Sequence, residues 1–180
     1  MNQDYALGPW SSTMRRYERQ TTFQFNWQQI AIAFWRRYPN KHSKHVLSED
    51  VIHRHINREG QLVSRRLFVK TNSCPKWIEK LIPSRKVHVL EDSCVDPKQE
   101  TLTTITRNIA MTNLMTVEET CVYKPHPENK AWTMLERKVI IDSKLYGLTG
   151  RAVKAFGLER YRYNAKKSDK GFLQTLLAHR

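Results

Sequence analysis

Turn signals divide the chain between residues 45 and 141 into short segments, and this division constrains the fold more than any other feature. The segments are rich in Thr and Val, which favour β-strands. Consecutive strands joined by short connections pair in the antiparallel sense. We therefore expect an antiparallel meander with strands at His45–Ile56, Leu62–Thr71, Val87–Val95, Thr101–Met111, Thr116–Lys124 and Trp132–Ile141, and a further strand at Thr21–Phe25.

The segment that follows the first expected strand has the spacing of an amphipathic helix. Asn26 and Gln29 stand three residues apart, as the two partners of a capping box do. Apolar residues at i, i+3, i+4 and i+7 then run from Trp27 to Tyr38. Proline interrupts helices, so we expect this helix to end at Pro39.

Two further helices are expected, one short and one long. The short one is amphipathic and covers Lys76–Ile82. The long one covers Leu148–His179, with a break near Lys167–Gly171, because Gly157 and Gly171 weaken it. The predicted fold class is α+β, with an antiparallel sheet of six or seven strands packed against one long C-terminal helix.

Size and charge narrow the class of protein. The chain has 180 residues, which suits one domain with a single core. Residues 1–14 lack periodicity, and we expect them to form a flexible lead. The longest apolar run, Ile30–Trp35, is too short to span a bilayer as a helix. Lys and Arg number 31 against 17 Asp and Glu, and the resulting charge of +14 predicts an anionic partner. Nucleic acid, an acidic protein and an anionic membrane all remain candidates.

One stripe of the long helix changes from apolar to basic. Residues three or four apart share a helix face, and here they are Val153, Phe156, Arg160, Asn164, Lys167 and Gly171. Buried cations without partners are costly, so an inward stripe predicts a cavity that receives an anion. The alternative is that this end of the helix projects beyond the sheet into water.

The strand at Leu62–Thr71 poses the same question. Arg66, Phe68 and Lys70 share one face, and the opposite face is more apolar. Ordinary antiparallel patterning would therefore place both cations in solvent. A cavity behind the sheet would reverse that interpretation.

The segment Ser73–Ile82 concentrates apolar residues between two expected strands. It could cover the sheet as a small satellite cluster. Alternatively, it is a lid or a membrane-contacting loop, with Trp77 at the interface and Lys76 and Lys80 beside it.

No arrangement of residues favours catalysis, a metal or a cofactor. His53 and His55 alternate on a strand but lack a third ligand with suitable spacing. Cysteine occurs three times, never as CxxC, so neither a closed disulfide framework nor structural zinc is expected. Cys121 has no evident His–Asp pairing, and no glycine-rich phosphate loop occurs. Adjacent acidic pairs on strands face opposite ways and form no carboxylate dyad.

Several separated motifs, in the same order, resemble the PRELI/MSF1 family. They are Phe34–Asn40, Ser43–Asp50, Ser64–Leu67, Pro75–Trp77, Leu90–Ser93, Val95–Pro97, Thr106–Asn108, Val117–Glu119, Phe156–Arg160, Asn164–Lys167 and Gly171-Phe172. The resemblance covers residues 15–178, which we take as the domain. It is greatest to the mitochondrial PRELI branch, whose members carry phosphatidic acid, rather than to the Slowmo branch.

The resemblance implies a curved sheet wrapped around the long helix and enclosing a lipid pocket. It implies transfer of phosphatidic acid between the outer and inner mitochondrial membranes, which supplies cardiolipin synthesis. The implied location is the intermembrane space, and the implied partner is a small helical hairpin with twin Cys-x9-Cys motifs. No reaction is implied, and we expect a protein that is not an enzyme.

The resemblance also assigns residues to the headgroup and to the lid. Positions that match the family's headgroup site are Arg37, His45, Arg66, Lys70, Arg160, Asn164 and Lys167. The family's mobile lid corresponds to residues 71–82, with expected lid or membrane contacts at Cys74, Pro75, Trp77 and Ile78.

Other functions stay open. A nucleic-acid-binding domain would show exposed aromatic and basic residues on an open sheet face. A phospholipid-cleaving enzyme would need a nucleophile with its base, or a metal, in the pocket. A phosphatidylserine carrier of the Slowmo type and a lipid sensor that releases slowly are further alternatives.

Overall fold

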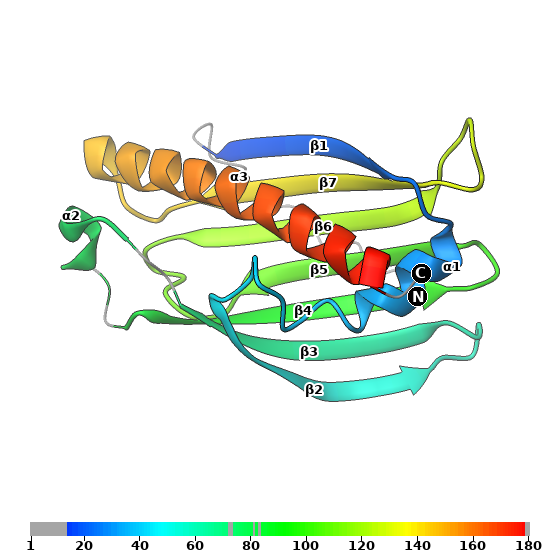
Figure 1. Cartoon of the computed structure of the whole chain (residues 1–180). Helices are drawn as coiled ribbons and strands as arrows, with labels where there is room; N and C mark the ends of the chain where they lie inside the picture. The colour runs from blue at the N-terminus through cyan, green and yellow to red at the C-terminus, as the bar shows by residue number, and fades with distance from the viewer. Residues whose placement is uncertain (1–13, 72–73, 81, 83, 179–180) are drawn as a thin grey trace, which may run out of the picture.

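A seven-stranded antiparallel sheet dominates the computed structural model, which describes residues 14–71, 74–80, 82 and 84–178 (Figure 1). The strand order is β1-β7-β6-β5-β4-β3-β2, so β1 and β2 are the two edges. The strands are β1 (Arg15–Phe23), β2 (Val46–Ile56), β3 (Leu62–Thr71), β4 (Lys86–Asp96), β5 (Thr101–Asn108), β6 (Thr116–Pro125) and β7 (Thr133–Asp142). The predicted meander is confirmed.

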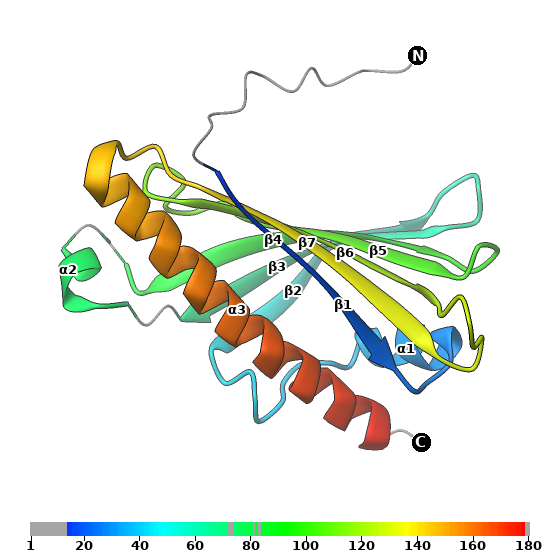
Figure 2. The same ribbon diagram turned by 90° about the horizontal axis from the view of Figure 1, so that it is seen from above.

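The helices gather on one face of this sheet. The long helix α3 (Gly147–Ala178) crosses the concave face, and α1 (Trp27–Phe34) lies beside its C-terminal end (Figures 1 and 2). The short helix α2 (Lys76–Glu79) lies at the opposite end of the molecule, near the start of α3 (Figure 2). This arrangement confirms the expected α+β fold, a curved sheet that holds a long C-terminal helix. Among the described helices, none has the length and hydropathy needed to cross a bilayer.

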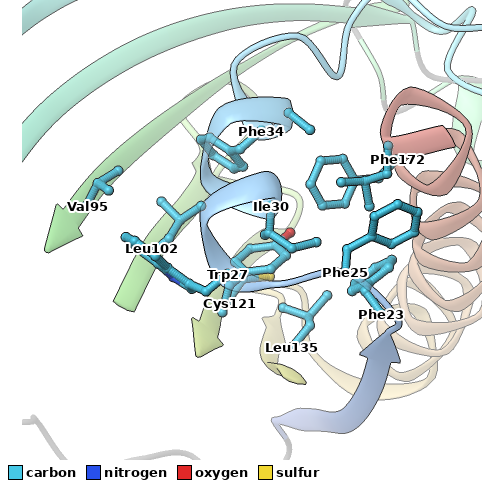
Figure 3. Close-up of a cluster of buried hydrophobic side chains, with 13 residues drawn as sticks. Phe23, Phe25, Trp27, Ile30, Phe34, Val95, Leu102, Cys121, Leu135 and Phe172 are labelled. Atoms are coloured by element: carbon cyan, nitrogen blue, oxygen red, sulfur yellow. The ribbon is translucent and has the colours of Figure 1, made fainter. Parts of the chain in front are cut away.

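The hydrophobic core occupies the α1 end of the space between sheet and helix (Figure 3). Asn26 and Gln29 form the predicted capping box, which fixes the start of α1. Ile30 of α1 is fully buried between Leu102 of β5 and Phe172 of α3. Because these side chains fill one end only, the other end of the same space is left for a cavity.

Three predicted boundaries are corrected. The first helix ends at Phe34 rather than at Pro39, because Arg37 turns inward to pair with a carboxylate of the sheet. The short helix ends at Glu79 rather than Ile82. The first strand begins at Arg15 rather than Thr21, and its charged start pairs along β7 as an edge. The lead, apart from Met14, and the expected helix end at His179 lie outside the described residues.

The long helix runs without the expected break at Lys167–Gly171. Its glycines are sites of close approach. A Cβ at Gly171 would meet the Asn40 side chain at 2.5 Å, and one at Gly157 would meet Met115 Sδ at 2.4 Å. The residues that lower helix propensity therefore bring α3 close to its neighbours.

Candidate ligand-binding cavity

A cavity of about 250 Å³ lies between the inner face of the sheet and α3, towards the α2 end. Much of its wall is apolar and comes from the start of β4, the loop between β5 and β6, and the start of β6. These apolar residues are Ile82, Val87, Val89, Met111, Leu114, Met115 and Val117. Such a wall suits an apolar ligand or the apolar part of an amphipathic one.

Positive charge collects on one side of this cavity. His45, Lys70 and Asn164 line it, and Arg160 and Lys167 lie on the same stripe of α3 as Asn164. The backbone carbonyl of His45 accepts a hydrogen bond of 2.7 Å from the Thr71 amide, which joins its loop to β3. We refer to His45, Lys70, Arg160 and Lys167 as the cationic corner.

The cations of this corner have no described carboxylate within ion-pair distance. Over the described part of the chain, Lys70, Arg160 and Lys167 form no ion pair within 4.0 Å. The Nε of Arg160 is buried without a hydrogen-bond partner. Burial, together with repulsion from these three cations, lowers the pKa of His45 to about 4. The corner therefore combines three cations with a histidine whose pKa is lowered, and its charge suits a compact anion.

Two other predicted headgroup residues belong to an ion-pair network, in which Arg37 Nη1 is buried without a hydrogen-bond partner. Arg66 is 1% exposed and binds Glu91 and Glu49, and its Nε lies 3.1 Å from Glu91 Oε1. Arg37 binds the second oxygen of Glu91 and stacks on Phe34, with 3.9 Å from its guanidinium carbon to the ring centroid. Two cations thus face two carboxylates.

The pKa values within this network follow from its contacts. Burial opposes the charges of Arg37 and Glu91, yet their attraction raises the pKa of Arg37 and lowers that of Glu91. Burial and repulsion from Arg37 lower the pKa of Arg66. Arg66 keeps its charge through two carboxylate partners, so the network stays ionised and balanced.

A second balanced ion-pair network was not predicted from the sequence. Arg137 of β7 is 6% exposed and binds Asp169 of α3 at 2.8 Å and Glu119 of β6 at 3.3 Å. Tyr161 donates a hydrogen bond of 2.6 Å to Glu119, and Arg19 lies 3.4 Å from Asp169. The sequence pattern could have indicated this network, because Arg137 lies on the same strand face as the apolar Leu135 and Val139.

The predicted lid residues differ in exposure. Trp77 is 48% exposed, and its ring lies 6.4 Å from that of Phe156, so α2 rests against α3. Ile78 is buried, whereas Cys74 and Pro75 are half-buried. This contact lies near the cavity wall formed by Ile82.

The described residues give little support for a metal site or a catalytic nucleophile. No three His, Cys, Asp or Glu side chains there lie close enough together to hold a metal ion. Burial raises the pKa of Cys121 well above its usual value, which keeps the thiol neutral and a poor nucleophile. His53 and His55 face each other at 4.7 Å between ring centroids, without a third ligand nearby.

Sequence comparison finds relatives over most of the chain. The model of the PRELI-like family matches residues 28–179. PRELI domain-containing protein 1, mitochondrial, from Gallus gallus is 50% identical over 149 residues, covering 81% of this chain and 69% of the relative. The Homo sapiens protein of the same name is 47% identical over 156 residues, covering 85% and 71%. Protein slowmo homolog from Dictyostelium discoideum is 30% identical over 157 residues, covering 87% and 68%.

Solved structures share the fold with far lower sequence identity. A Thermus thermophilus protein has a TM-score of 0.62 at 15% identity, covering 92% of this chain and 99% of that one. The Zhui aromatase/cyclase from a Streptomyces species has a TM-score of 0.53 at 10% identity, covering 92% and 93%. These likenesses concern the arrangement of sheet and helix alone.

Proposed function

The chain belongs to the PRELI-like family, and from this we propose that it is a lipid-transfer protein that carries phosphatidic acid. Transfer would run between the outer and inner mitochondrial membranes and supply cardiolipin synthesis. The mitochondrial relatives support the organelle, and we place the protein in its intermembrane space. We further propose that a small helical-hairpin protein with twin Cys-x9-Cys motifs binds it as a heterodimer.

The cationic corner is the observation that carries this proposal. Phosphatidic acid ends in a small phosphomonoester that carries up to two negative charges. Arg160 offers a planar set of donors, and Lys70 and Lys167 offer point charges, both of which suit phosphate oxygens. Because the cavity wall beside them is apolar, the acyl chains would extend away from the charged end.

The seven predicted headgroup residues divide into two roles under this proposal. Lys70, Arg160 and Lys167, with His45 and Asn164, would contact the phosphate. Arg37 and Arg66 would act as positioning residues, because Glu91 already engages both guanidinium groups. A rigid, balanced network behind the corner would hold β3 and β4 at a fixed distance.

Loading requires the lid to open. The cavity of about 250 Å³ is small for a ligand with two acyl chains, since pockets for drug-sized ligands alone measure about 300–1,000 Å³. We propose that α2 moves away from α3 by parting Trp77 from Phe156. Cys74, Pro75 and Ile78 would move with it as the lid.

Transfer of a lipid involves no making or breaking of covalent bonds. We therefore propose that the protein is not an enzyme and needs no cofactor. The neutral Cys121 supports this, because a thiol with a raised pKa is a poor nucleophile.

The test is transfer of labelled phosphatidic acid between vesicles, with and without the hairpin partner. Lys70→Glu should abolish transfer, whereas the same reversal at the exposed Lys138 of β7 should leave it intact. Faster transfer of phosphatidylserine would indicate a Slowmo-type carrier instead. Salt-dependent RNA binding without any lipid transfer would refute the proposal.

A further inference from the structure

The turn between β7 and α3 presents the two most exposed large apolar side chains of the described residues. Tyr146 is 94% exposed and Leu148 is 82% exposed. They flank Gly147, whose φ of +64° lies in the left-handed region that favours glycine. This conformation turns the chain sharply and leaves both side chains without neighbours to cover them.

The turn lies at the cavity end of the molecule. Ser143 Oγ donates a hydrogen bond of 2.6 Å to the carbonyl of Leu114, a residue that lines the cavity. Both ribbon views place the start of α3, the loop between β5 and β6, and α2 at this same end (Figures 1 and 2). Exposed apolar residues occur on the other two elements as well, at Ile109 and Trp77.

Positive charge predominates around this turn. The segment Ser143–Leu158 contains Lys144, Arg151 and Lys154 and no acidic residue. Lys144 and Arg151 are exposed, whereas Lys154 is buried 3.9 Å from Asp142. An apolar tip with exposed cations beside it is complementary to an anionic membrane, whose surface attracts each Lys or Arg and whose interface accepts Tyr.

We propose that the turn Tyr146–Leu148 is a fixed membrane anchor, separate from the lid, that inserts into anionic bilayers and faces the cavity towards them. The turn binds a membrane rather than a peptide, because Tyr146 and Leu148 line none of the hollows found among the described residues. The turn is continuous with β7 and α3, so it keeps its place while α2 moves. The inference rests on the proposed function in one respect, since a lipid leaving the cavity must pass this end.

Vesicle binding by the full chain tests the anchor. Phosphatidylcholine vesicles with phosphatidylglycerol serve as the probe, because they contain no transferable phosphatidic acid. Tyr146→Ser with Leu148→Ser should lower the partition coefficient by at least about tenfold, since two apolar side chains no longer leave water. The matched control replaces Ile32 of α1 and Ile56 at the end of β2, which are 62% and 72% exposed, with Ser. Helix α1 lies at the opposite end of the molecule from α2 (Figure 2).

The control should bind vesicles like the wild type, and both variants should keep its unfolding temperature because all four side chains are exposed. Lys144→Glu with Arg151→Glu should weaken binding to the anionic vesicles and leave any binding to pure phosphatidylcholine unchanged. Wild-type binding by the Tyr146/Leu148 variant would overturn the anchor. So would an equal loss in the control.

A soluble ligand separates this inference from the proposed function. The Tyr146/Leu148 variant should still bind dioctanoyl phosphatidic acid in solution but transfer the long-chain lipid more slowly. A wild type that docks on vesicles through these residues without binding dioctanoyl phosphatidic acid would refute the carrier and leave the anchor standing. Normal transfer by the variant would overturn the anchor alone.

Discussion

Removal of the Glu91 charge should destabilise the protein more than any other single polar change on the inner face of the sheet. Glu91 is 4% exposed, and each of its oxygens accepts a hydrogen bond from a different arginine, Arg66 or Arg37. Glu91→Gln keeps the shape of the side chain but places a neutral amide between two guanidinium groups. Arg66 keeps Glu49 as an ion-pair partner, whereas Arg37 is left without a described carboxylate within 4.0 Å.

The size of the effect follows from burial. Breaking a buried ion pair by removing one partner costs about 3–5 kcal/mol, because the remaining charge stays buried and uncompensated. For a chain of this size, each kcal/mol lowers the unfolding temperature by about 2–4 °C. We therefore expect Glu91→Gln to unfold roughly 10 °C below the wild type. Total stability of about 5–15 kcal/mol leaves the variant folded at room temperature.

Circular dichroism during heating, with urea unfolding at 25 °C, measures the change. Glu118→Gln is the matched control, because it is the same substitution at an exposed carboxylate of β6 and should alter stability by less than about 0.5 kcal/mol. Adding Arg37→Met to Glu91→Gln should recover part of the loss, since it removes the unpaired charge. Glu91→Gln with a wild-type unfolding temperature would show that the network is not structural.

The remaining predictions concern pH and the helix glycines. The folded chain keeps His45 neutral down to its pKa of about 4, whereas an unfolded histidine gains a proton below about pH 6.5. Stability should therefore fall as the pH drops through this window, and His45→Gln should remove that part of the loss in urea unfolding; an equal loss in the variant would contradict this. Gly171→Ala should destabilise the protein by about 1–2 kcal/mol, because Asn40 is held by its own hydrogen bonds and cannot give way. Gly157→Ala should be near neutral, because a flexible Met115 can shift and alanine favours the helix by about 1 kcal/mol; thermal unfolding of the two variants compares them, and equal losses would refute the distinction.

Hydrophobic pattern and turn chemistry predicted the meander, the capping box of α1 and the long C-terminal helix. The pattern could not predict that α3 stays continuous at Gly171, because propensity acts locally whereas the contact with Asn40 comes from a distant loop. The same limit explains why the predicted end of the first helix was wrong. Its apolar spacing extends to Tyr38, but the helix ends at Phe34, where the chain turns Arg37 towards Glu91 on β4.

The strand pattern grouped Arg66 with Lys70 and could not distinguish their roles. Both face inward, but Arg66 stands opposite Glu91 in the register of β3 and β4, whereas Lys70 stands opposite Val87. Arg66 pairs with the carboxylate across from it, whereas Lys70 forms no ion pair within 4.0 Å among the described residues. The sequence alone does not give the register, so only the fold could separate the ion-paired Arg66 from the cavity-lining Lys70.

The free cations have a thermodynamic consequence for a carrier. Lys70, Arg160 and Lys167 all lie close enough to His45 to lower its pKa, so like charges gather in a half-buried site, which is unfavourable without a counter-charge. A bound phosphate removes that repulsion and should raise the pKa of His45, so loading stabilises the fold by mass action. On release, the cations lose the negative charge of the phosphate. An anionic membrane surface at the cavity end can supply negative charge in its place, because its lipid headgroups attract the same cations. Under the proposed function, a cationic corner beside balanced ion-pair networks would favour loading in solution and would link unloading to the membrane.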